Sequence, residues 1–158
     1  SNPGVADDPL GFTFIGDKQR LARDLLEVRF MIEPQMASMA AEHATEDQIM
    51  CIRELCDESQ RLAEAGEDYS ATDTAFHNAI AESCGNLVVP RLMGVLKASV
   101  PLFIDVTGKK LVEETIRTHR GVADAIAARN PTAAHDAMYL HLVYNRNMIA
   151  EGAQAKSE

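Results

Sequence analysis

Apolar residues recur at spacings of three and four along most of the chain, and this period limits the fold more than any other feature. Between residues 17 and 43 the stripe consists of Leu21, Leu25, Val28, Ile32, Met36 and Met39. Such spacing places apolar side chains on one face of an α-helix, whereas a half-buried strand alternates with period two. Few stretches of the chain alternate in that way. The sequence therefore predicts an all-α fold.

Capping residues, glycines and prolines divide this pattern into six or seven helices. Thr45 and Gln48 have the spacing of a capping box for a second helix, which Gly66 ends. Ser70 is expected to cap a third helix, which Gly85 closes. A fourth helix is expected from Pro90, a fifth over 109–130 and a sixth from Pro131, with kinks or breaks at Pro34, Pro101 and Gly108. Short connections between these helices predict an antiparallel bundle.

The length of 158 residues fits one domain with a single core. Residues 1–16 are polar and rich in proline and glycine, so we expect them to form a flexible lead. The helical domain is expected over 17–152, followed by a flexible tail over 153–158. No apolar run reaches the length of a transmembrane helix and no signal peptide is apparent, so no membrane association is expected.

The composition argues against a nucleic-acid surface on this chain. The net charge is −9, and aromatic residues make up only 5%. Neutralising phosphates requires clustered lysine and arginine, and stacking on bases requires aromatic side chains. The three cysteines form no CxxC pair, which disfavours a disulfide framework and favours a reducing, cytoplasmic setting.

Three of the five histidines fall on or beside the apolar stripes of three different predicted helices: His77, His119 and His141. Asp73 lies one helical turn before His77, so their side chains share a face. Three imidazoles and a carboxylate from facing helices can hold a metal, and this donor set suits Zn, Ni, Fe, Mn or Co better than Ca or Mg. Alternatively, the histidines are satisfied core residues. His43 is expected to be structural, and His135 is expected to be exposed.

Three stretches occur in the order typical of a known family: DLLEVRFMIEPQMASMAAEHAT, DTAFHNAIAESCGN and THRGVADAIAARNPTAAHDAMYLHL. The chain resembles the C-terminal effector-binding (FCD) domain of the FadR subfamily of GntR-type bacterial transcription regulators. That family has Asp-x-x-x-His on one helix, a histidine opening an HRxxxxAI stretch, and a histidine in a final HL. The matching residues are Asp73, His77, His119 and His141, and the resemblance covers roughly residues 19–147.

The resemblance implies that these four residues bind a divalent metal, with a small organic acid beside it. Zn is the metal expected in a purified sample, with Ni, Mn, Fe or Co as alternatives. Arg29, in the EVR motif, is expected to pair with the acid, because its planar fork suits a carboxylate. Removing Arg29 should then abolish acid binding and leave metal binding intact. The alternative for Arg29 is a surface ion pair with Glu27 or Glu33.

Two asparagines are further candidates for ligand binding. Asn86 follows the predicted metal helix, and its alternative role is a helix cap or turn residue. Asn145 lies one turn after His141 and could line the same pocket.

The family also implies an N-terminal winged helix-turn-helix domain, but no basic recognition helix precedes residue 17 here. DNA contact is therefore expected only through that absent domain. The expected partners are a small carboxylate effector and a second copy in a homodimer, and no enzymatic activity is expected.

Three rival functions remain open at this point. A metal-dependent enzyme, either a hydrolase or a non-haem iron oxygenase, could use the same ligands, but a hydrolase needs a general base near the bound water, and only Asp73 is well placed. A di-iron carboxylate bundle would need two Glu-x-x-His motifs, and none occurs. A metal-free structural bundle would use the three histidines as core residues.

Overall fold

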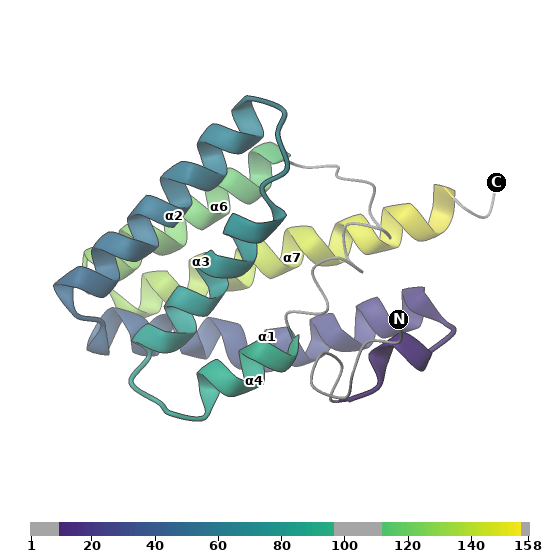
Figure 1. Ribbon diagram of the computed structural model, residues 1–158, viewed down its shortest axis with the longest axis horizontal. Helices are drawn as coiled ribbons and strands as arrows, with labels where there is room; N and C mark the ends of the chain where they lie inside the picture. Colours follow the sequence, from purple (N-terminus) through teal and green to yellow (C-terminus); the bar gives the residue numbers. More distant parts are fainter. Residues whose placement is uncertain (1–9, 97–111, 156–158) are drawn as a thin grey trace, which may run out of the picture.

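The computed structural model describes residues 10–96 and 112–155, with side chains except at residue 13 and beyond 150. Within these ranges the chain forms six α-helices, one short 3-10 helix and no β-strand (Figure 1). The elements are η1 (Phe12–Phe14), α1 (Lys18–His43), α2 (Glu46–Glu64), α3 (Ser70–Ser83), α4 (Val89–Leu96), α6 (Val112–Ala127) and α7 (Pro131–Ala155). The predicted all-α bundle is confirmed.

The two longest helices, α1 and α7, pack against each other and run in opposite directions (Figure 1). Helix α6 contacts both α7 and α2, while α3 contacts α1, α2 and α4. Helices α3, α6 and α7 therefore surround one interior, and α1 packs against all three of them. None of the described helices is both long and apolar enough to span a bilayer.

Local signals fixed several helix ends as the sequence predicted. The side chain of Thr45 accepts a hydrogen bond from the backbone N–H of Gln48, and the Gln48 side chain accepts one from the Thr45 N–H, which completes the capping box. Gly66 and Gly85 follow the ends of α2 and α3 with φ of 72° and 77°. This left-handed conformation is the usual helix terminator and favours glycine.

Other predicted boundaries are corrected. Pro34 is buried inside the continuous helix α1 and does not divide it. The lost backbone hydrogen bond costs about 3 kcal/mol, which the packing of α1 against α3 and α7 offsets. Ser70 is the first residue of α3 rather than its cap, and its N–H donates to the Asp68 side chain. Pro101, Gly108 and the predicted start of the fifth helix lie outside the described residues.

Two described elements lie at the ends of the predicted domain. The 3-10 helix Phe12–Phe14 lies within the segment expected as a flexible lead, and Phe12 packs against the core. Helix α7 continues to Ala155, three residues beyond the expected end of the domain at residue 152.

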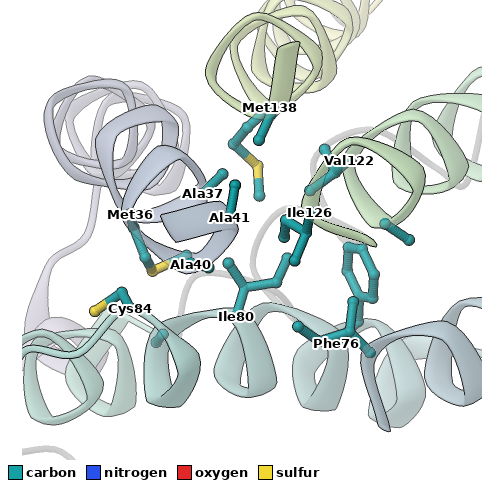
Figure 2. Packing of buried hydrophobic residues seen from close by; sticks show 14 of the residues in the cluster. Met36, Ala37, Ala40, Ala41, Phe76, Ile80, Cys84, Val122, Ile126 and Met138 are labelled. Carbon is teal, nitrogen blue, oxygen red and sulfur yellow. The ribbon is translucent and has the colours of Figure 1, made fainter. Parts of the chain in front are cut away.

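Small residues on α1 allow the helices to approach closely. Ala37 and Ala40 are fully buried there and face Ile80 from α3 and Met138 from α7 (Figure 2). On the same interior, Phe76 is also fully buried and stacks on the ring of His119, with centroids 4.5 Å apart. The apolar core therefore continues directly into a polar cluster.

Candidate metal centre

Three helices bring three imidazoles together inside the bundle. His77 on α3, His119 on α6 and His141 on α7 are all buried. Their ring centroids lie between 4.6 and 5.3 Å apart. One ring nitrogen from each histidine lies within 4.8 Å of the other two. The three histidines chosen from the sequence thus meet at one place.

Asp73 joins this cluster from the preceding turn of α3. Its Oδ1 lies 3.1 Å from Nε2 of His119 and 3.8 Å from Nε2 of His77. The structure therefore brings together all four residues that the sequence proposed as ligands. The other two histidines lie apart, since His43 ends α1 and His135 contacts Asp136 on the surface.

Several polar atoms of the cluster have no hydrogen-bond partner among the described residues. They are Asp73 Oδ1, both ring nitrogens of His77 and His119 Nε2, all of them buried. Buried polar atoms are nearly always paired in native proteins, so these unpaired atoms indicate that a bound group lies between them in the native state. Ligand atoms bound about 2.0–2.2 Å from one Zn ion lie roughly 3–4 Å from each other. The two Asp73 separations, 3.1 and 3.8 Å, fall in this range, and the histidine nitrogens lie within 4.8 Å of one another. The nitrogen-rich donor set suits Zn, Ni, Fe, Mn or Co.

Burial favours the neutral form of two imidazoles of the cluster, those of His119 and His141. It lowers the pKa of His119 to about 4, and it lowers the pKa of His141 well below its ordinary value, helped by the neighbouring His119 and His77. A metal ligand must be unprotonated at the coordinating nitrogen, so neutral rings are ready to bind without losing a proton first.

Sequence reasoning missed Glu33 as part of the site. This carboxylate is fully buried, and its Oε2 lies 3.0 Å from Nδ1 of His77. Its Oε1 accepts a hydrogen bond of 2.7 Å from Nε of Arg29, and its Oε2 accepts one of 3.2 Å from Nη2. Burial alone would raise the pKa of Glu33, but Arg29 and His77 outweigh it and lower the pKa to about 2. Glu33 is therefore an ionised residue beside the cluster.

Thr118 and Asn145 both contact His141. The Oγ1 atom of Thr118 lies 3.0 Å from Nδ1 of His141. Nδ2 of Asn145 lies 3.4 Å from Nε2 of the same ring. Asn145 was a sequence candidate and lies at the cluster, whereas Thr118 was missed because a helix threonine carries no distinctive signal.

The other two ligand candidates have different surroundings from those expected. Arg29 does pair with Glu33, but the pair is buried rather than on the surface. Asn86 is exposed, and its Oδ1 accepts hydrogen bonds of 2.8 and 3.2 Å from the N–H groups of Val88 and Val89. Asn86 thus caps the start of α4, and none of its described contacts reaches the cluster.

The family model of the FCD domain matches residues 24–144, which include all four residues of the cluster. The HTH-type transcriptional regulator LutR of Bacillus subtilis is 30% identical over 143 residues, covering 84% of this chain and 64% of LutR. The HTH-type transcriptional repressor NanR of Escherichia coli K12 is 26% identical over 148 residues, covering 85% of this chain and 56% of NanR. The chain thus spans little more than half the length of such curated relatives.

A solved structure shows the same fold. Streptococcus agalactiae GntR superimposes with a TM-score of 0.80 at 34% sequence identity, covering 91% of this chain and 66% of that one. FCD domains are parts of transcription regulators rather than enzymes, so the hydrolase and oxygenase alternatives lose their support. The chain belongs to the FCD domain family, the effector-binding domains of GntR-type transcription regulators.

Proposed function

We propose that this chain is the ligand-sensing domain of a regulator of the FadR subfamily, in which a divalent metal and a small organic acid control DNA binding by another domain. The observation that supports it most is the cluster of three buried histidines and Asp73, in which four buried polar atoms have no described hydrogen-bond partner. The relatives named as HTH-type regulators are longer than this chain, which leaves length for a DNA-binding domain. A homodimer is part of the same proposal.

The four cluster residues would hold the metal, and each has a distinct origin. His77 and Asp73 come from one turn of α3, His119 from α6 and His141 from α7. A six-coordinate ion with four protein ligands supplies two further positions for water or the oxygens of an acid. Because three helices contribute ligands, occupation of the site would tie α3, α6 and α7 together.

Two residues are placed to assist a bound carboxylate. Arg29 is a buried cation near the cluster, close enough to Asp73 to interact with its charge. A guanidinium has five N–H groups, and its described contacts use only Nε and Nη2 on Glu33, so it can also contact an acid. The amide of Asn145, beside His141, adds a second donor. Together they would give an acid directional hydrogen bonds in a water-poor interior.

Metal analysis of the purified chain tests the first half of this proposal. We expect about one divalent ion per chain by mass spectrometry of the digested protein, with Zn predominant. A chelator-treated sample that takes up no Zn, Ni, Mn or Co and gains no stability from them would contradict the proposal and favour the metal-free bundle.

The second half is tested with a library of small carboxylates in a thermal-shift screen, run with metal-loaded and chelator-treated protein. We expect a subset of acids to raise the melting temperature only when metal is present. Matched uncharged amides of the same acids serve as controls. Stabilisation by acids that is equal with and without metal would separate acid binding from the metal and reject the shared site.

A further inference from the structure

We infer that Glu33 and Thr118 surround the cluster and determine the tautomers of His77 and His141. In these tautomers Nδ1 carries the proton, and the Nε2 lone pair of each ring is available at the centre of the cluster. Each residue contacts the Nδ1 side of one ring, at 3.0 Å in both cases. The inference adds to the proposed metal site, and it rests on the proposed function for the metal that would bind there. The tautomers themselves are properties of the metal-free chain.

The hydroxyl of Thr118 determines the tautomer of His141 by elimination. A hydroxyl has one hydrogen, and Oγ1 of Thr118 lies 2.8 Å from Glu114 O and 3.1 Å from Thr115 O, two carbonyls that can only accept it. A hydrogen directed to either carbonyl leaves the oxygen as an acceptor toward Nδ1 of His141, and we expect that nitrogen to carry the proton. Nε2 of His141 then carries the lone pair. Its described neighbour is the amide Nδ2 of Asn145, which is a hydrogen-bond donor.

Glu33 acts on His77 through its charge. Its carboxylate is fully buried and paired with Arg29, so it is ionised and can only accept. A lone pair on Nδ1 facing this oxygen at 3.0 Å would be repelled, whereas a proton there is attracted. The Nδ1 of His77 is not aligned for a good hydrogen bond, but the attraction does not depend on ideal alignment. The proton therefore resides on Nδ1, and Nε2 turns to the cluster.

Glu33 and Thr118 together extend the site to four helices. Glu33 reaches His77 on α3 from α1, while Thr118 reaches His141 on α7 from α6. Residues that orient metal-bound histidines through their other ring nitrogen typically change metal affinity by 10–100-fold when they are lost. Glu33 and Thr118 are thus positioning residues, and Arg29 supports Glu33 by neutralising its buried charge.

Nitrogen-15 NMR of the imidazoles in the metal-free chain tests the inference directly. We expect His77 and His141 to show a protonated Nδ1 and an unprotonated Nε2. In Thr118→Val, the His141 signals should shift toward a mixture of tautomers, whereas Thr118→Ser should retain the parent pattern. A parent chain whose His77 or His141 carries the proton on Nε2 overturns the inference, and this measurement needs neither a variant nor a metal.

Zinc affinity, measured by competition with a chromophoric chelator, gives the second readout. We expect Thr118→Val and Glu33→Gln to bind zinc 10–100-fold more weakly. Thr74→Val is the matched control, because Thr74 also donates to a helix carbonyl four residues earlier, Ser70 O at 3.0 Å, without a described imidazole contact. Equal zinc affinity in the parent and both variants rejects the positioning role. A parent that binds no metal but shows the expected tautomers rejects only the proposed metal.

Discussion

Helix α1 carries two ion pairs that look the same in the sequence and differ in the structure. Arg20 pairs with Asp24 at 3.6 Å, with side chains 73% and 60% exposed. Arg29 pairs with Glu33 at 2.7 Å, with side chains 8% and 0% exposed. Both pairs have the order arginine then acid, four residues apart. The spacing makes the residues neighbours, and the packing of other helices over them decides what the contact is worth.

The difference follows from the surroundings of each pair. An exposed pair contributes about 0–1 kcal/mol to the free energy of unfolding, because water stabilises the separated charges almost as well as their mutual attraction does. A buried pair that loses one partner leaves a charge without solvent. Glu33 also contacts His77, so the buried pair is joined to the candidate metal site. The same contrast separates the buried histidines of the cluster from His135, whose side chain is 43% exposed.

The ion pairs provide the largest predicted effect. Glu33→Ala should lower the free energy of unfolding by about 3–5 kcal/mol, because it leaves the Arg29 charge buried and unpaired. Asp24→Ala should lower it by less than about 1 kcal/mol. Urea denaturation of the metal-free proteins, followed by circular dichroism, measures both. Similar losses for the two variants would remove the contrast between the pairs.

The histidines provide the second test. With zinc at about a thousand times its dissociation constant, the metal should stabilise the parent by about 4 kcal/mol, or roughly 10 °C in Tm. His119→Ala should lose this stabilisation, whereas His135→Ala should keep it, because His135 lies on the surface. Differential scanning calorimetry with saturating zinc and with chelator measures the shift. An unchanged zinc effect in His119→Ala would place the metal elsewhere.

Local signals explain why much of this structure was predictable from the sequence. Helix periodicity, the capping box of Thr45 and the turn at Gly85 depend on residues close in the chain. The four residues of the cluster were singled out because histidine and aspartate are chemically distinctive and matched a family pattern. Glu33 and Thr118 were missed because their roles depend on residues 44 and 23 positions away, His77 and His141. No local pattern distinguishes such residues from an ordinary surface glutamate or helix threonine.

Arg29 is the next test, because the buried pair changes what its removal should do. Arg29→Lys should weaken acid binding by about 10–100-fold, since a lysine cannot keep the two contacts to Glu33 and also reach a carboxylate. Arg29→Ala should now weaken metal binding as well, through the loss of support for Glu33, instead of leaving it intact. Arg20→Lys is the matched control on the same helix and should change neither affinity. Isothermal titration with zinc, then with the acid found in the screen, measures both affinities. Unchanged zinc binding in Arg29→Ala would mean that Arg29 serves acid binding alone, as the sequence predicted.

The effect with the smallest change per step of the measurement is a pH dependence of the metal-free chain. The pKa of His119 is about 4 in the fold and about 6.5 in an unfolded chain, so between these values the unfolded state binds a proton that the folded state does not. Stability must then fall as the pH drops from 6.5 to 4, by up to about 1.4 kcal/mol per unit for each such group. The stabilising contribution of Glu33, whose pKa is lowered from 4.5 to about 2, is lost only below pH 4.5.

Urea midpoints measured with chelator at half-unit steps from pH 7.5 to 4.5 isolate the pH range in which the histidines act. His119→Phe should reduce the slope, because a phenylalanine can still stack on Phe76 but cannot titrate, while His141 still contributes. A parent whose stability stays constant across that window would mean that the buried imidazoles accept protons as readily as exposed ones, and the contrast between the two environments would not extend to the histidines.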